Sequence, residues 1–196
     1  MDKELGKILG IVLGIITIVL IAVTFFVNLG TYTANFTRLG ITISQYTTNT
    51  TYFGSTSSGH FRSWGNITNG MTGATLNKAN TGIDMIYASI GTMIVALLFA
   101  IIGIVAVFGK SSKIMKNMNF IAPIVSAIFI VVTIVLYYEG ALTVAKAITS
   151  TYIFPSIEKI TVTSTTSLAI GAYLAIAAVI VEFLAAVFNI LSRSKN

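Results

Sequence analysis

The sequence contains no cysteine, a single histidine and few charged residues, and each shortage excludes a class of site. Without cysteine there is no disulfide, no thiolate metal site and no cysteine nucleophile. With His60 as the only histidine, haem ligation by two histidines and the HExxH zinc pattern are excluded. Charged residues make up 9% of the 196 residues and hydrophobic ones 55%, whereas soluble domains carry about 25% charged residues. The composition indicates a membrane protein, of a length that suits one domain.

Catalytic constellations are also missing from the sequence. It has no paired intramembrane aspartates, no Ser–His pair and no glycine-rich phosphate loop. The net charge is +6, but the basic residues are spread in small groups rather than in a dense run. We therefore expect no enzyme activity, no cofactor, no metal and no nucleic-acid partner.

Four stretches are long enough to cross a bilayer, which takes about 20 apolar residues. They cover residues 8–27, 83–108, 120–138 and 167–191, and the third can continue as a helix to about residue 150. The apolar core of the first stretch is longer than that of a cleaved signal peptide, and no A-x-A site closes it. We expect the first stretch to be retained as a membrane anchor.

The orientation follows from three short basic segments: "KELGK" before the first span, "GKSSKIMKN" between the second and third, and "SRSKN" after the fourth. Short loops rich in Lys and Arg face the cytoplasm. Both termini are therefore expected inside. A long loop at about residues 28–82 and a shorter one at about 150–166 are expected outside.

Both outer loops contain strand-like segments. "TYTANFT" alternates polar residues with Tyr32, Ala34 and Phe36, which is the period of a strand, and "ITISQYT" and "KITVTSTT" are also rich in β-formers. "HFRSWGNITNGMTGATL" predicts two strands around an Asn69-Gly70 turn. A disordered Thr/Ser-rich loop is the alternative, and the many aromatic residues weigh against it. The predicted fold is a mainly α membrane protein: a four-helix bundle with a small antiparallel sheet formed by the outer loops.

The long loop carries three Asn-x-Thr sequons, at Asn35, Asn49 and Asn66. Because glycans are added on the outer side, their shared location predicts N-glycosylation there. Residues 28–82 also contain no Asp or Glu. Either the Thr/Ser/Gly bias explains this, or the exterior is acidic enough to protonate carboxylates.

This order of elements resembles that of the claudin-like four-span membrane proteins. Four spans, internal termini, a long β-rich first outer loop and a short second one are shared, as is "EGALTVAKAITS" extending the third span. The signature of that family, a Trp, then Gly-Leu-Trp, then two Cys, is represented here only by Trp64 in "SWGN". The resemblance implies lateral self-association and contacts made by the outer sheet, and no functional residues are carried over.

Small residues mark one face of several predicted helices. Gly6, Gly10 and Gly14 recur every four residues in the first span, and Ala178 and Ala186 flank Glu182 in the fourth. Such faces let helix backbones approach closely. We expect them to meet protein rather than lipid.

Glu182 is the one carboxylate inside the fourth span, about 13 Å from its inner end at 1.5 Å per residue. A charge at such depth costs roughly 2.5–3.5 kcal/mol or more. No basic residue lies at that depth in the other spans, but Thr17 and Ser126 do. We expect a neutral Glu182 hydrogen-bonded to one of these hydroxyls. Conduction of protons or cations, and pairing with a cation of a partner subunit, are the alternatives.

Together these features predict a structural or interaction glycoprotein of a cell envelope or virion membrane. It would be multi-pass in a plasma membrane or viral envelope, contact lipid, carry N-glycans and present its outer sheet. It would also self-associate through its helices or join membrane-complex partners. The alternative is a small channel or transporter, or an accessory subunit of a membrane complex, that uses Glu182.

Overall fold

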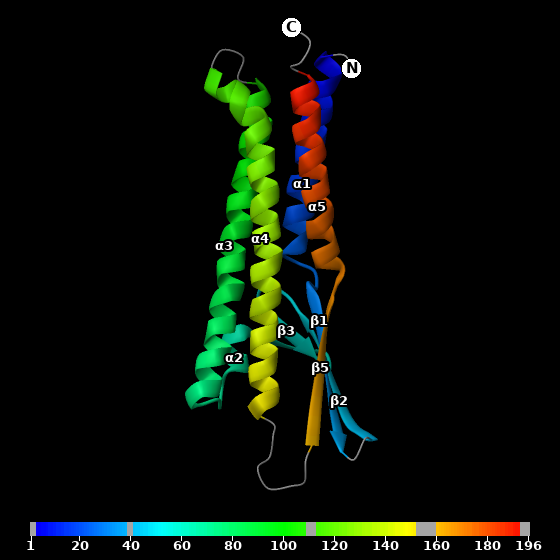
Figure 1. The fold of residues 1–196 in the computed structure, drawn as a ribbon, viewed down its shortest axis with the longest axis vertical. Helices are drawn as coiled ribbons and strands as arrows, with labels where there is room; N and C mark the ends of the chain where they lie inside the picture. The colour runs from blue at the N-terminus through cyan, green and yellow to red at the C-terminus, as the bar shows by residue number, and fades with distance from the viewer. Residues whose placement is uncertain (1–2, 39–40, 109–112, 152–159, 193–196) are drawn as a thin grey trace. The chain divides into compact units, whose positions relative to one another are not determined.

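The computed structural model describes residues 3–38, 41–108, 113–151 and 160–192 (Figure 1). Its long helices are α1 (Lys3–Thr24), α3 (Gly73–Phe108), α4 (Lys113–Thr151) and α5 (Ile170–Leu191), with a one-turn helix α2 (Trp64–Ile67). The strands are β1 (Gly30–Arg38), β2 (Ile41–Thr50), β3 (Gly54–Ser57), β4 (His60–Ser63) and β5 (Ile160–Leu168). All four long helices are apolar enough to cross a membrane. The predicted fold class is confirmed.

The chain divides into two compact units. The first comprises Met1–Phe25, Ile90–Ile134 and Tyr173–Asn196, and the second comprises Phe26–Ser89 and Val135–Ala172. Both α3 and α4 are longer than the predicted spans, because each contributes residues to both units. Each unit has its own packing and is described separately.

Close contacts join the four helices of the first unit into a ring. Gly10 of α1 lies against Asn189 of α5, and Gly14 lies against Ile104 of α3. From α3 to α4, Phe99 stacks on Phe129 with ring centroids 6.2 Å apart. Bonds between α4 and α5, described below, complete the ring.

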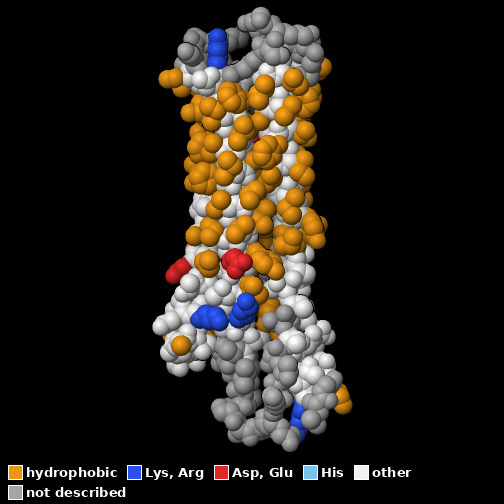
Figure 2. All heavy atoms as spheres, in the orientation of Figure 1, with side chains coloured by type: hydrophobic (Ala, Val, Ile, Leu, Met, Phe, Trp, Pro, Cys, Tyr) orange, Lys and Arg blue, Asp and Glu red, His pale blue; other side chains and the backbone are white. Residues whose placement is uncertain are grey.

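The outward surfaces of these helices are apolar. Large side chains such as Ile8, Val19, Leu98 and Val131 are exposed, whereas the buried positions hold mostly small residues. Figure 2 shows hydrophobic side chains gathered over the helices. Since a surface of this kind is stable only when it is removed from water, the helices contact membrane lipid.

The second unit contains a five-stranded antiparallel sheet in the order β4-β3-β2-β1-β5. Strand β1, between β2 and β5, pairs along its whole length with both neighbours, so that Ala34 lies opposite Tyr46 on one side and Ser164 on the other. The turn between β3 and β4 consists of Ser58 and Gly59, both with positive φ (49° and 79°). This pattern is that of a type I′ hairpin, which requires φ > 0 at both central residues. The strands predicted in "TYTANFT", "ITISQYT" and "KITVTSTT" are confirmed.

The hairpin predicted around Asn69-Gly70 is wrong. His60–Ser63 is a strand, but its partner is β3, and the chain then forms α2 and enters α3 at Gly73. Gly70 does adopt a positive φ of 88°, although the turn it makes connects two helices. The preference for helix follows from tertiary packing, because the helical turn of α2 buries Trp64 at 2% exposure.

Trp64 and two tyrosines form the centre of the second unit. The indole Nε1 of Trp64 donates to the carbonyl oxygen of Tyr52 at 3.0 Å. The Tyr52 ring packs edge-on against Tyr137 of α4, with centroids 5.3 Å apart. Elsewhere Tyr32 and Ala34 of β1 pack against Ala145 of α4. The sheet is therefore fastened to α4 by buried aromatic groups.

In the same unit α3 and α4 touch through their backbones at two glycines. A Cβ added to Gly82 would lie 2.7 Å from the carbonyl oxygen of Gly140, and one added to Gly140 would lie 2.6 Å from that of Gly82. No side chain fits between helices at this separation. The sequence analysis did not single out either glycine.

Candidate functional site

The first unit is built around Glu182, whose side chain is 1% exposed. It lies on an α5 face of which every buried member is small or polar. In the first unit these residues are Ala175, Ala178, Glu182, Ala185, Ala186, Asn189 and Ser192. Among the buried residues that the structure describes, Glu182 is the only one of a charged type. No basic side chain of the described chain offsets a negative charge there.

Ser126 of α4 is the hydrogen-bond partner of the Glu182 carboxyl. The Ser126 hydroxyl also donates to the carbonyl oxygen of Ala96 on α3, at 2.9 Å. A serine hydroxyl has one proton to donate and two lone pairs with which to accept. Ser126 therefore links α5, α4 and α3 through one side chain.

Polar residues recur at seven-residue spacing on two helices around this carboxyl. On α5 they are Glu182 and Asn189, and on α4 they are Asn119, Ser126 and Thr133. Asn189 Nδ2 donates to the Asn119 carbonyl oxygen at 2.9 Å, and the next bonded pair along α4 is Ser126 with Glu182. Seven residues correspond to about 10.5 Å of helix. The polar groups therefore form layers within the unit.

Thr17 of α1 and Thr92 of α3 add further polar groups to these layers. On α1, Thr17 follows Gly10 by seven residues, which places it level with Glu182 because Gly10 contacts Asn189. In the outermost layer of the unit, the Thr92 and Thr133 hydroxyls are 2.7 Å apart. Thr17, Ser126 and Glu182 thus share one layer, with a bond between Ser126 and Glu182.

Several oxygen atoms in these layers have no hydrogen-bond donor within the described chain. They are Thr17 Oγ1, Asn119 Oδ1, Glu182 Oε1 and Asn189 Oδ1, all buried. A buried oxygen without a donor costs roughly 1–3 kcal/mol. These oxygen atoms can therefore accept a further hydrogen bond or bind a cation. The described residues contain no group of three His, Cys, Asp or Glu side chains that could hold a metal ion.

The small residues that the sequence pointed to face this interior. Gly6, Gly10 and Gly14 are all buried on α1, and a Cβ on Gly10 would overlap Asn189 Oδ1. Ala178 and Ala186 are buried beside Glu182 on α5. These faces are used for packing within one chain. The glycine face of α1 is accordingly not free to join a second copy.

The three sequon asparagines lie in different settings. Asn35 is half-buried on β1, opposite Gln45 and Thr163. Asn49 is half-buried on β2, where its Oδ1 accepts a hydrogen bond from Thr31 Oγ1 at 3.1 Å. Asn66 is exposed on α2. Of the three, Asn66 offers the most accessible side-chain amide.

Asn119 and the Thr92–Thr133 pair were missed by the sequence analysis, which considered each polar residue separately. A signal was nevertheless present, since Asn119, Ser126 and Thr133 share a seven-residue spacing with Glu182 and Asn189. That spacing places residues on one helix face. The Gly82–Gly140 contact had no comparable signal, because single glycines are frequent in membrane helices.

No protein-family model matches the chain, and a comparison with curated proteins found no match. The resemblance to claudin-like proteins stays a prediction from the order of the elements.

Proposed function

We propose that this multi-pass membrane protein is a structural or interaction protein of a cell envelope or virion membrane. In this proposal the four helices anchor the chain, the Glu182 layer holds them together, and the sheet unit is presented outside to a partner. The observation that carries it is the folded state of the second unit. A connecting loop has no need of a five-stranded sheet with a buried Trp64, whereas a surface module that binds a partner does.

The proposal requires the second unit to be outside, which the absence of cysteine makes easy to test. Ala74→Cys, exposed on α3, should react with a membrane-impermeant maleimide in intact cells. Lys116→Cys, exposed on α4, should react only after permeabilisation, because short basic segments stay inside. The unmodified chain is the background control. Labelling of residue 116, but not 74, in intact cells would reverse the proposed orientation.

N-glycosylation belongs to the same proposal. Native material should have a mass above the 20.9 kDa of the bare chain, with glycan on Asn66 and, to a lesser extent, on Asn35 or Asn49. Asn66 should be modified most completely because it is exposed and outside the sheet. Thr68→Ala removes that sequon without changing Asn66 itself, so it should lower the mass by one glycan. An intact mass equal to the bare chain would remove glycosylation from the proposal.

A second candidate function is passage of protons or cations through the first unit. It is favoured by the four buried oxygen atoms that lack a donor, since oxygen atoms are what a hard cation binds. Ser126 bonds both to Glu182 and to the carbonyl oxygen of Ala96, and this link between three helices favours the structural role instead. The Glu182 variants discussed below separate the two functions.

A further inference from the structure

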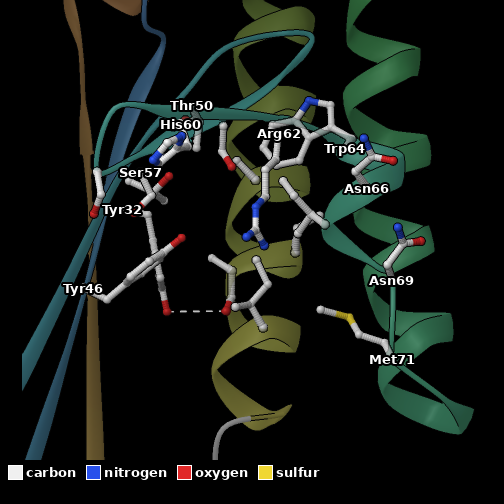
Figure 3. A pocket seen from close by; sticks show the side chains of 18 of the residues that line it. Tyr32, Tyr46, Thr50, Ser57, His60, Arg62, Trp64, Asn66, Asn69 and Met71 are labelled. Carbon is white, nitrogen blue, oxygen red and sulfur yellow. Dashed lines mark hydrogen bonds between the residues drawn. The ribbon is translucent and has the colours of Figure 1, made fainter.

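A cavity of about 750 Å³ lies in the second unit (Figure 3). The sheet forms one side of the cavity, where Tyr32 and Tyr46 line it. The opposite side is the α2 segment with the turn after it, and part of α4 lines the cavity as well. Its volume is in the range of small-molecule sites, about 300–1,000 Å³. None of the lining residues of this cavity belongs to the Glu182 layer, and its place outside the membrane rests on the function proposed above.

Arg62 of β4 contributes a charged side chain to the lining of the cavity. Figure 3 shows its guanidinium group in the middle of the space, with Tyr46 toward the sheet and Asn69 and Met71 on the other side. No carboxylate is among the lining residues that the structure describes. Within the described part of the chain, Arg62 makes no ion pair or side-chain hydrogen bond. Its planar set of donors is therefore available to a ligand.

The surrounding sequence adds to this positive character. Residues 28–82 contain Arg38, Arg62 and Lys78 but no Asp or Glu. A cavity with one unpaired cation and no acidic side chain among its lining residues favours an anion. Arg is also the residue best shaped to bind a carboxylate, through two parallel hydrogen bonds.

Beside His60, Ser55 and Ser58, the other polar groups of the lining form two sets. The hydroxyls of Tyr32, Thr48, Thr50 and Ser57 each donate to a backbone carbonyl oxygen, so their protons are already used. The side chains of Tyr46, Asn66 and Asn69 have no hydrogen-bond partner within the described chain. Tyr46 and Asn69 offer a hydroxyl and an amide to a ligand, whereas the Asn66 amide is the one proposed above to carry a glycan. The site therefore combines one cation with several neutral groups that donate and accept.

The α4 side of the cavity is apolar. It consists of Ala141, Val144, Ala145 and Ile148. The Tyr46 ring, 39% exposed, adds a flat apolar surface on the sheet side. A ligand that fits must have a face of C–H groups as well as hydroxyls and a negative charge. A free inorganic anion has no such face.

We infer that this cavity binds an acidic sugar, with Arg62 pairing with its carboxylate, Asn69 and Tyr46 bonding its hydroxyls, and the apolar wall covering its C–H face. Monosaccharides with a carboxylate, free or at the end of a glycan, have this chemistry. The cavity is then a recognition site for a carboxylated carbohydrate on the outer side of the membrane.

The test uses the full chain in detergent, produced in a host without N-glycosylation so that the chain's own glycans do not compete with the probe. Binding is followed by calorimetry and by the fluorescence of Trp64, the only tryptophan, which lines the cavity. Glucuronate is the probe, and glucose is the matched neutral sugar. Glucuronate should bind at least tenfold more tightly than glucose. Added salt should weaken only the glucuronate complex.

Arg62→Gln should lower glucuronate affinity by about tenfold to a hundredfold, the range expected for a lost charge-assisted hydrogen bond, and leave glucose binding unchanged. Lys78→Gln is the control, because Lys78 is an exposed cation of the same unit that does not line the cavity. It should bind glucuronate as the wild type does. Unchanged Trp64 emission without ligand shows that each variant is folded.

Three results would overturn the inference. Equal affinity for glucuronate and glucose would mean that charge has no role. Undiminished glucuronate binding by a folded Arg62→Gln chain would place the anion elsewhere. Acetate or phosphate binding as tightly as glucuronate would reduce the site to a simple anion site. Glycan-bound and free acidic sugars are distinguished by comparing glucuronate with a glycan that ends in it.

Discussion

Glu182→Gln should fold with nearly wild-type stability, Glu182→Ala should be less stable, and Glu182→Lys should be the least stable of the three. Gln preserves the shape of the side chain and can keep a hydrogen bond with Ser126 Oγ. Ala removes that bond, worth about 0.6 kcal/mol on average between membrane helices, and leaves a cavity that adds to the loss. Lys places a cation in a layer without a carboxylate, at a cost of roughly 2.5–3.5 kcal/mol.

Thermal unfolding in detergent measures this order. The matched control is Glu139→Lys, because Glu139 is an exposed carboxylate on α4. The same substitution there should change the free energy of unfolding by only about 0.5 kcal/mol or less. If Glu182→Lys were as stable as Glu139→Lys, Glu182 would not be enclosed by the helices.

Flux measurements on the same variants decide between the two candidate functions. In vesicles, the structural role predicts that wild type and Glu182→Gln are equally impermeable to protons and cations. Passage through the layer predicts a robust wild-type flux that disappears in Glu182→Gln, since the amide cannot titrate. Loss of flux in a Gln variant of unchanged stability would establish the transport function and remove the structural one.

We expect the second large effect from alanine at Gly82 or Gly140, which should lower the free energy of unfolding. Alanine at Gly91 should raise it. A Cβ at Gly82 would also come within 2.9 Å of the Val144 nitrogen, so α3 and α4 would have to separate. Overpacking of this kind costs typically 1–3 kcal/mol. Gly91, on the same helix, has open space around its Cβ position. There alanine should stabilise the helix by about 1 kcal/mol.

The emission of Trp64 reports on this experiment, because that side chain is buried in the unit that contains both glycines. Gly82→Ala and Gly140→Ala should lower the midpoint of the Trp64 transition, whereas Gly91→Ala should not. The double variant should cost less than the sum of the two, since helices separated by one Cβ have room for the other. Equal stability of Gly82→Ala and Gly91→Ala would contradict the close contact.

The sequence alone determined the membrane character, the four spans and most of the strands. Each depends on a local pattern: an apolar run of about 20 residues, or a two-residue alternation such as that of Tyr32, Ala34 and Phe36. Glu182, Thr17 and Ser126 could also be singled out from the sequence, because polar residues are costly in an apolar run. Neither kind of inference requires knowledge of what lies across the fold.

The tertiary structure alone decided what these residues touch. Asn69-Gly70 has the composition of a hairpin turn, but burial of Trp64 favours a helical turn, and the hairpin forms at Ser58-Gly59 instead. Gly10 meets Asn189 of its own chain rather than a second copy, and Gly82 meets Gly140. Ser126 is both partner of Glu182 and donor to Ala96. These outcomes depend on contacts between residues far apart in the chain, where packing and hydrogen-bond satisfaction override local preference.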